Sequence, residues 1–247
     1  MEGAVEVLGI DIGGSGIKVA PADVTAGALT RERIKVLTPQ PATPKAVAEA
    51  VRGVVAQFGW SGKAGITFPG VVTDGVIRTA ANVDPAWIGV NARDLLGSST
   101  GLEVQVVNDA DAAGLAEMKF GAGAGQQGTV VVLTFGTGIG SALFTNGVLV
   151  PNTEFGHIEI RGKDAEKRAS ERAREVHNLD WEHWAGRVQE YMSHLEALLW
   201  PELFIVGGGV SRKSDKFLPL LGGLHARVVP AKLHNDAGIV GAALVGS

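Results

Sequence analysis

The sequence predicts an α/β protein made of two similar halves that face each other across a cleft. Two observations carry this prediction. Each half opens with three runs of β-formers joined by turns, and continues with an amphipathic helix and a buried strand. The first turn of each half is rich in glycine. We therefore expect residues 1–108 and 233–247 in one domain and residues 109–232 in the other.

The elements of the first half follow one another closely. We expect strands at residues 5–11, 16–20 and 33–38, where runs of β-formers are joined by turns. Residues 44–58 have apolar side chains at helical spacing, which predicts an amphipathic helix. Residues 65–70 are typical of a buried strand that ends in a loop.

The second half repeats this scheme. We expect three short strands, a helix, two further strands and a closing helix that is rich in Ala, Gly and Val and packs against one of the halves. The expected limits are 129–135, 141–145 and 147–151 for the first strands, 181–199 for the helix, 203–206 and 225–229 for the later strands, and 235–245 for the closing helix.

Two glycine-rich turns, residues 9–16 and 133–141, point to phosphate binding. Glycine has no Cβ, so its backbone reaches positive φ and lets consecutive N–H groups converge on one anion. Four hydroxyls add donors to these turns: Ser15, Thr134, Thr137 and Ser141. Neither turn matches the Walker pattern or the dinucleotide-binding fingerprint, and one such turn alone is more often an ordinary tight hairpin. Two similar turns in one chain favour phosphate binding on two β-hairpins.

Composition narrows the class of protein. Hydrophobic residues make up 45% of the chain and charged residues 19%, as in soluble globular proteins. The formal net charge of −4 argues against nucleic-acid binding as the main role, and the absence of cysteine excludes disulfides and thiolate metal sites. No signal segment precedes the first expected strand, and no apolar run is long enough to span a membrane. A cytoplasmic protein without nucleic-acid or membrane partners is therefore expected.

A candidate catalytic base stands at the end of a predicted strand. Val106 and Val107 lead into Asn108 and Asp109, at the strand end where an α/β sheet presents side chains to its crevice. Asp109 would remove the proton from a substrate hydroxyl, while Asn108 orients a neighbouring hydroxyl. The alternative is a helix N-cap, which Asn and Asp favour. The two roles are compatible, and Asp111 is the residue expected to start the helix.

A second polar group follows the first strands of the second half. Glu154 and His157 suit a sugar, because each sugar hydroxyl both donates and accepts hydrogen bonds. The alternative for His157 is an ordinary satisfied histidine. Asn82 lies in a polar loop with Trp87, whose ring would either stack on a sugar or pack in the core. Glu166 falls in a highly charged segment, where a solvated face is the expectation for most residues.

An ordered set of motifs that covers nearly the whole chain resembles the ROK sugar kinases, a family within the actin and hexokinase (ASKHA) fold. The set is Asp11-Ile12-Gly13-Gly14-Ser15-Gly16-Ile17-Lys18, Pro69-Gly70, Asn108-Asp109, Phe135-Gly136-Thr137-Gly138-Ile139-Gly140, Glu154-x-Gly156-His157 and Gly207-Gly208-Gly209-Val210-Ser211. The resemblance implies two RNase H-like α/β domains. Within the family, the short length and the stretches 200–203 and 234–238 look most like the bacterial glucokinases that use polyphosphate, some of which also use ATP and accept mannose.

The resemblance also implies an activity and a role for each matching residue. The activity is transfer of a phosphoryl group from polyphosphate or ATP to the 6-hydroxyl of glucose, with Asp109 as the catalytic base and Mg²⁺ near Asp11. The sugar would be held by Asn82, Asn108, Asp109, Glu154, His157 and Glu166. The donor would be held by Asp11, Gly13, Gly14, Ser15, Gly16, Lys18, Thr134, Gly136, Thr137, Gly138, Gly207 and Gly208.

One departure from the family pattern concerns zinc. Many ROK proteins carry a cysteine-rich zinc motif shortly after the histidine, and this chain has 0 cysteines. No zinc is therefore expected, and His157 would be released from metal ligation. Loss of the zinc motif is what the resemblance to the polyphosphate branch implies.

The residues leave the donor and two other classes of protein open. Lys18, Arg212, Lys213 and Lys216 are candidates for a cationic track along polyphosphate, with scattered surface charges as an equal alternative. A hexokinase that uses only ATP would share every residue named above. A non-catalytic sugar sensor would need a DNA-binding segment before Gly9, and only eight residues precede it. A chaperone-like ATPase would need a peptide-binding extension, and none is visible in the sequence. The size of each half is compatible with a homodimer.

Overall fold

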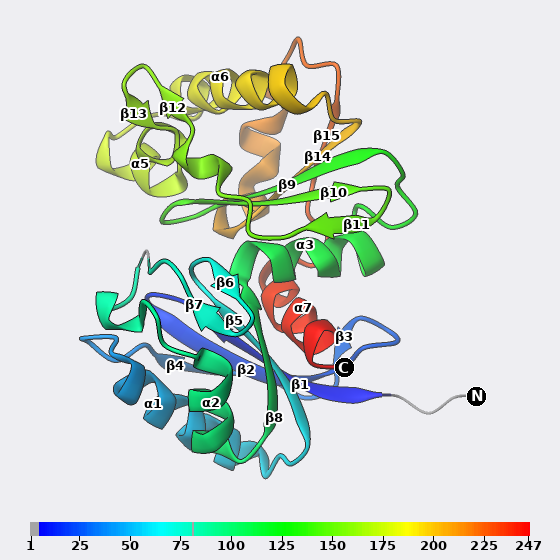
Figure 1. Cartoon of the computed structure of the whole chain (residues 1–247). Helices are drawn as coiled ribbons and strands as arrows, with labels where there is room; N and C mark the ends of the chain where they lie inside the picture. Colours follow the sequence, from blue (N-terminus) through cyan, green and yellow to red (C-terminus); the bar gives the residue numbers. More distant parts are fainter. Residues whose placement is uncertain (1–4, 81) are drawn as a thin grey trace. The chain divides into compact units, whose positions relative to one another are not determined.

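The computed structural model describes residues 5–80 and 82–247, which fold as two compact units. Unit 1 consists of Met1–Ala116 and Asp236–Ser247, and unit 2 of Glu117–Asn235 (Figure 1). The domain limits expected from the sequence and the cleft between the halves stay predictions. The first four residues of the expected first domain, and Ala81 in the polar loop before Trp87, lie outside the described residues.

Unit 1 is built on a six-stranded mixed sheet. β1 runs antiparallel to β2 and parallel to β5, which in turn is parallel to β8. The order is β3-β2-β1-β5-β8, and β4 also pairs with β2. The carboxyl ends of β1, β5 and β8 therefore share one edge of the sheet, where ligand-binding groups gather in α/β proteins. The strands are β1 (Glu6–Ile12), β2 (Gly16–Asp23), β3 (Ala28–Leu29), β4 (Ile34–Leu37), β5 (Lys63–Phe68) and β8 (Glu103–Asn108).

Two helices cover one face of this sheet. α1 (Pro44–Phe58) begins where the side chain of Thr43 accepts the N–H of Ala46, and a proline takes its first position. It ends at Gly59, which adopts the left-handed conformation that glycine tolerates. α1 and α2 (Ala92–Thr100) pack together with the sheet in one hydrophobic core.

The C-terminal helix α7 (Ala237–Gly246) packs on β1 and β5 through glycines. A Cβ on Gly9 would collide with the carbonyl oxygen of Ile239, and one on Gly65 with that of Ala242. The neighbouring residues of both strands point to the opposite face, into the core shared with α1 and α2. The missing side chains let the backbone of α7 approach the sheet closely.

Trp87 packs in the core of unit 1, which decides between the two roles left open for it. Its ring is fully buried, 4.8 Å from that of Phe68, and its Nε1 donates to the carbonyl oxygen of Ala42 at 2.9 Å. The surrounding short elements of unit 1 are β6 (Val72–Thr73), β7 (Val76–Ile77) and η1 (Pro85–Trp87).

Unit 2 repeats the plan of unit 1 on a five-stranded sheet with the order β11-β10-β9-β14-β15. β9 is antiparallel to β10 and parallel to β14, and β14 is parallel to β15, as β1, β2, β5 and β8 are in unit 1. These matching orders confirm the predicted duplication and the α/β class. The strands are β9 (Thr129–Phe135), β10 (Ile139–Thr145), β11 (Val148–Val150), β14 (Leu203–Gly207) and β15 (Arg227–Pro230).

Helix α6 (Trp181–Leu199) supplies much of the core of unit 2. Trp184, Val188, Met192 and Leu195 recur at helical spacing and are all fully buried. Helix α3 (Asp109–Phe120) crosses from unit 1 into unit 2 along the chain. The shorter elements are η2 (Phe155–His157), β12 (Glu159–Ile160), β13 (Lys163–Asp164), α4 (Glu166–Ala169), α5 (Glu171–Val176), η3 (Gly209–Lys216), η4 (Leu218–Leu220) and η5 (His234–Asp236).

Most of the predicted helices and strands are present, including the short strands β4, β11 and β15, whereas helix α2 was not predicted. The limits of α1, α6 and β9 are those expected, whereas the elements of residues 155–176 were not predicted. None of the helices in the described part of the chain is both long and apolar enough to cross a membrane. The cytoplasmic location stays a prediction.

Candidate active site

The first glycine-rich loop joins β1 to β2 in unit 1. The N–H of Gly13 donates to the carbonyl oxygen of Gly16 across it at 3.0 Å. No glycine of this loop has a positive φ. The prediction that these glycines are needed for a left-handed backbone is therefore wrong. Their small size matters instead, because a Cβ on Gly14 would lie 2.7 Å from the Cβ of Asn82. Gly14 thus lets the exposed Asn82 lie against the loop.

Asp11 lies near the carboxyl end of β1 and is held by three elements. The ammonium of Lys18, its partner in the hairpin register, lies 2.8 Å from Oδ2. Thr67 on β5 donates its hydroxyl to Oδ1 at 2.9 Å. Gly238 lies in the first turn of α7, and a Cβ there would be 3.0 Å from Asp11 Cγ. The positive end of this helix favours the carboxylate, and the charge of Lys18 is already paired.

Asn108 is the N-cap of α3. Its Oδ1 accepts the N–H groups of Ala110 and Asp111 at 2.9 and 3.0 Å. Its Nδ2 donates to the carbonyl oxygen of Gly70 at 3.1 Å, so the buried amide also ties β8 to the loop after β5. The expectation that Asp111 starts the helix is wrong, because the cap places the first helical residue at Asp109.

Asp109 is half-buried at the point where β8 gives way to α3. This is the edge of the sheet where the carboxyl ends of β1, β5 and β8 meet. Its Oδ1 accepts the N–H of Ala110 at 2.9 Å. The capping role thus belongs to Asn108, and the role of Asp109 as general base stays a prediction.

The second glycine-rich loop joins β9 to β10 in unit 2 and is built like the first. The N–H of Gly136 donates to the carbonyl oxygen of Gly138 at 3.0 Å. Beside it, Gly207 ends β14 and Gly208 has a φ of 82°. A Cβ on Gly208 would lie 2.6 Å from the backbone nitrogen of Phe135, so only glycine fits there. The predicted donor segments of unit 2 therefore lie together at one edge of its sheet.

The backbone of Ile139, the first residue of β10, ties the predicted sugar residues to the second loop. Oε2 of Glu166 accepts its N–H at 3.3 Å. A Cβ on Gly156 would collide with its carbonyl oxygen, so this glycine brings η2 against β10. Glu154 and His157 flank Gly156 along the chain, which gives the Glu-x-Gly-His spacing a physical reason.

Ser141 holds the segment around Glu154 instead of offering a hydroxyl to phosphate. It is buried, donates to the carbonyl oxygen of Thr153 at 2.7 Å and accepts the N–H of Phe155 at 3.0 Å. Both bonds fall on the residues adjacent to Glu154 in the chain. The sequence-based interpretation of this hydroxyl is therefore wrong, because its hydrogen bonds are used for positioning.

Asp164 joins the predicted sugar residues and was missed in the sequence. His157 Nε2 lies 3.8 Å from Oε2 of Glu154, and its Nδ1 lies 3.7 Å from Oδ2 of Asp164. Ligand atoms of His157, Asp164 and Glu166 lie within 4.8 Å of one another. These oxygen and nitrogen atoms suit sugar hydroxyls, and they are also ligand types for divalent cations. The expected absence of zinc stays a prediction.

Burial raises the pKa of Glu154, with His157 opposing the rise and the negative charge of Glu166 adding to it. A carboxyl whose folded-state pKa is raised binds its proton more tightly in the folded state. The stability it contributes is therefore present at low pH and is lost as pH rises through the unfolded value and on to the folded one.

We expect Glu154→Gln to raise the melting temperature at pH 7, because the neutral amide removes a partly buried charge. The gain should vanish below about pH 4, where the carboxyl is protonated in both states. Thermal unfolding of both proteins between pH 3 and pH 8 measures this. An equal gain at every pH would mean that packing, and not charge, distinguishes the two proteins.

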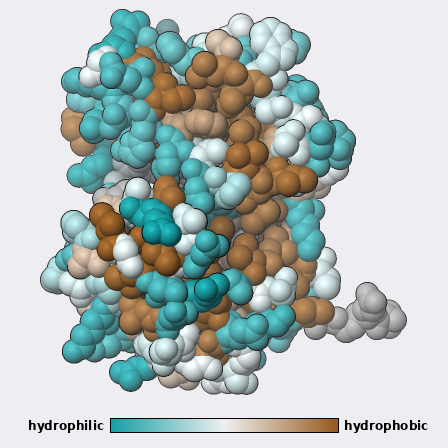
Figure 2. Space-filling view, in the orientation of Figure 1, coloured by the Kyte–Doolittle hydropathy of each residue, from teal (hydrophilic) through white to brown (hydrophobic). Residues whose placement is uncertain are grey.

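The charged segment 161–174 is solvated in part only. Figure 2 shows hydrophilic side chains over β12, β13 and α5, and Arg161, Lys163, Lys167 and Arg172 are exposed as expected. Glu166 departs from this pattern, because it is half-buried against the second loop. The sequence does not distinguish it from its charged neighbours.

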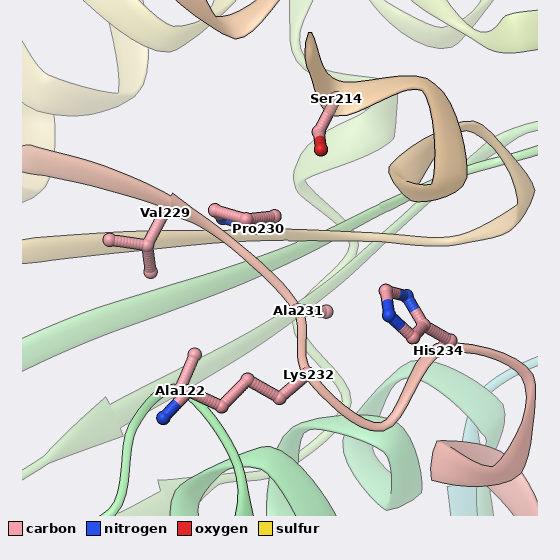
Figure 3. A pocket seen from close by; sticks show the side chains of 7 residues that line it. All are labelled: Ala122, Ser214, Val229, Pro230, Ala231, Lys232 and His234. Atoms are coloured by element: carbon pink, nitrogen blue, oxygen red, sulfur yellow. The ribbon is translucent and has the colours of Figure 1, made fainter.

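A pocket of about 480 Å³ in unit 2 was not predicted. Ser214 of η3 lies on one side, and Lys232 and His234 lie on the segment that follows β15 (Figure 3). Its wall is otherwise made by Ala122, Val229, Pro230 and Ala231. Three segments far apart in the sequence line it, so no local pattern could reveal it.

Glu117 on α3 holds two of the segments that line this pocket. Glu117 is 1% exposed, and its carboxylate accepts three backbone N–H groups, which compensate for the buried charge. The donors are Ala122, Lys232 and Leu233, at 2.8, 3.1 and 2.7 Å. No local pattern singles out Glu117, because two of these donors lie more than a hundred residues away.

Each unit gathers its own share of the predicted residues, whose roles stay predictions. Unit 1 holds Asp11, Gly13, Gly14, Ser15, Gly16, Lys18, Asn82, Asn108 and Asp109. Unit 2 holds Thr134, Gly136, Thr137, Gly138, Glu154, His157, Glu166, Gly207 and Gly208.

Three known proteins are similar to the chain over most of its length. The polyphosphate glucokinase of Mycobacterium tuberculosis is 57% identical over 237 residues, which cover 96% of this chain and 89% of that protein. The structure of the inorganic polyphosphate/ATP-glucomannokinase from Arthrobacter sp. strain KM matches with a TM-score of 0.93 and 52% identity, over 97% of both chains. A ROK family glucokinase from Streptomyces griseus, solved in complex with glucose and AMPPNP, matches with a TM-score of 0.83 and 28% identity, over 97% of this chain and 98% of that one.

The family model described as the ROK family matches residues 7–170. This stretch contains both glycine-rich loops, Asn108-Asp109 and the Glu154-x-Gly156-His157 motif. The fold, the arrangement of these motifs and the similarity to the three proteins agree with it. The chain therefore belongs to the ROK family.

Proposed function

We propose that this protein is a glucokinase that uses inorganic polyphosphate, and also ATP, to phosphorylate the 6-hydroxyl of glucose. The observation that carries the proposal is the 57% identity to a polyphosphate glucokinase over 96% of the chain. The match to a polyphosphate/ATP-glucomannokinase supports ATP as a second donor and mannose as a second acceptor. The enzyme is thus a phosphotransferase with an alcohol group as acceptor.

Asp109 acts as the general base in this proposal. Its carboxylate accepts the proton of the sugar hydroxyl while the hydroxyl oxygen attacks the terminal phosphorus of the donor. A new oxygen–phosphorus bond forms, the bond between that phosphorus and the bridging oxygen breaks, and the shortened donor leaves. Asn108 supports this role by capping α3, which fixes where Asp109 begins the helix.

Sugar recognition falls to the polar residues around Ile139 and to Asn82 beside the first loop. Carboxylates accept hydrogen bonds from sugar hydroxyls, and an imidazole both donates and accepts them. The N–H of Ile139 holds the side chain of Glu166, and the contact of Gly156 with Ile139 positions the backbone between Glu154 and His157, so less rearrangement is needed to orient the sugar. Asn108 adds its amide only if its hydrogen bond to Gly70 is exchanged.

Mg²⁺ is the metal that we propose for the reaction, near Asp11. A carboxylate oxygen suits Mg²⁺, which is commonly held by one or two carboxylates together with substrate phosphates. Lys18 lies 2.8 Å from Oδ2 of Asp11, so Mg²⁺ would share this carboxylate with the ammonium or displace it. Bound there, the metal would neutralise charge on the transferring phosphoryl group. The two glycine-rich loops add backbone N–H groups for the same charge.

The pocket beside η3 suits the nucleoside of ATP. Valine, proline and alanine form much of its wall, and Ser214 and His234 provide hydrogen-bonding groups. We expect Ala122→Phe to raise KM for ATP about tenfold by filling this space, and to leave KM for polyphosphate within about twofold. Ala124→Phe, an exposed position in the same loop, is the matched control. If Ala122→Phe raised KM for ATP and KM for polyphosphate equally, the nucleoside of ATP would not bind in this pocket.

The proposed function is tested by sugar-6-phosphate formation from glucose with Mg²⁺ and a single donor at a time. Activity with long-chain polyphosphate is the expected result. Activity with ATP alone would indicate an ordinary ROK glucokinase, and the absence of activity with either donor would favour a sugar-binding regulator. The predicted homodimer is tested on the same preparation by measuring its mass in solution.

A further inference from the structure

Three cations surround one aromatic ring in unit 2. The guanidinium carbon of Arg174 lies 4.4 Å from the ring centroid of Trp181, and the ammonium nitrogens of Lys213 and Lys216 lie at 5.9 and 5.8 Å. We call Arg174, Lys213 and Lys216 the basic cluster. Phe217 stacks on the same ring with an interplanar angle of 16°. The ring is therefore covered by Arg174 and Phe217 and holds cations in place, which leaves it unsuited to stacking on a nucleobase.

Among the described residues no direct ion pair neutralises the basic cluster, although Glu171 and Glu175 lie on α5 and Asp215 lies on η3. In the part of the chain that the structure describes, none of its three members forms a salt bridge. Nε of Arg174 is buried and, among the described residues, has no hydrogen-bond partner. Glu171 is the carboxylate that feels the charges of Lys213 and Arg174, which oppose the rise that burial causes in its pKa. Like charges held together this way attract an anion.

The basic cluster lies on the elements that adjoin both donor segments of unit 2. The N–H of Arg172, in the first turn of α5, donates to the carbonyl oxygen of Gly136 in the second loop at 3.0 Å. A Cβ on Gly209, which begins η3, would lie 3.1 Å from Oε2 of Glu171. Arg174 is thus one helical turn from residues that touch the loops, and Lys213 and Lys216 are on η3 itself.

We propose that the basic cluster binds the distal phosphates of a polyphosphate chain, beyond those held by the glycine-rich loops. This inference rests on the proposed function and locates its donor. ATP ends in a nucleoside after three phosphates, whereas polyphosphate continues as a repeating anion that can reach additional cations. The cluster should therefore affect polyphosphate and have little influence on ATP.

The test is the double variant Lys213→Gln with Lys216→Gln, in which the side chains keep most of their length and lose their charge. At low salt we expect KM for long-chain polyphosphate to rise about tenfold, with KM for ATP and both kcat values within about twofold. KM for polyphosphate should also depend less steeply on salt in this variant than in the unchanged protein, because fewer charges are screened. KM for glucose should barely change with salt in either protein.

Two control variants separate charge at this site from other effects. Lys213→Arg with Lys216→Arg preserves both charges and should keep KM for polyphosphate within about twofold. Lys45→Gln with Lys63→Gln removes the same charge from exposed positions of unit 1 and should do the same. Melting temperatures of all variants, measured alongside, show that each is folded.

Three outcomes would contradict the inference. An unchanged KM for polyphosphate in the Gln double variant would overturn it while leaving the proposed function intact. An equal rise in KM for ATP would show that the basic cluster binds phosphates that both donors have, and not the distal phosphates of polyphosphate. Absence of polyphosphate use by the unchanged protein would overturn the proposed function, and this inference with it.

Discussion

Asp109→Asn is expected to lower kcat with either donor by about 10²–10⁴-fold, the usual effect of removing a positioned general base. Asparagine keeps the size of the side chain, and the cap of α3 is made by Asn108, so the helix should begin where it does now. Glucose binding should stay measurable by calorimetry, because the amide still forms hydrogen bonds. The loss should therefore fall on kcat and much less on glucose affinity.

Asp74→Asn is the matched control for this substitution. Asp74 is exposed in a turn of unit 1 with a φ of 53°, a conformation that asparagine also tolerates. It should retain full activity and the same melting temperature. If Asp109→Asn turned over nearly as fast as this control, Asp109 would not be the base.

Glu117→Ala is expected to lower the free energy of unfolding by about 2–4 kcal/mol, because three charge-assisted hydrogen bonds are lost together. The melting temperature should fall by roughly 10 °C. Glu117→Gln should give an intermediate loss, since one amide oxygen remains to accept while the NH₂ group faces N–H donors. Glu182→Ala, an exposed carboxylate of unit 2, should cost less than about 1 kcal/mol.

Urea and thermal unfolding of the unchanged protein and of these three variants measure the effect. Because Glu117 fixes the backbone of two pocket-lining segments, Glu117→Ala should also raise KM for ATP more than KM for polyphosphate. Stability equal to that of Glu182→Ala would mean that water replaces the carboxylate at little cost.

Local patterns predicted the parts of the fold that are determined locally. The spacing of apolar residues predicted α1 and α6, because each buries one face along its whole length. The two glycine-rich hairpins and the repeated order of strands followed from the same kind of pattern. The pairing of Asp11 with Lys18 was also within reach, since both lie at matching distances from the turn of one hairpin.

The remaining site residues depend on contacts that no local pattern contains. Asp164 is brought close to His157 by the short antiparallel pair β12 and β13, and Glu166 is half-buried against the second loop. The same holds for Gly9, Gly14, Gly65 and Gly208, which allow close approach to segments distant in the chain. The sequence shows that these residues are small, but it does not show which segments they contact.

The glycine-lined contact of α7 with β1 and β5 has a consequence for synthesis on the ribosome. Unit 2 is one continuous stretch, so all of it has been made before the last residues of unit 1 appear. The second face of the unit 1 sheet stays uncovered until residues 237–246 have been made and α7 packs on it. We expect unit 2 to acquire its native structure first, while the strands of unit 1, made earlier, depend on residues 237–246.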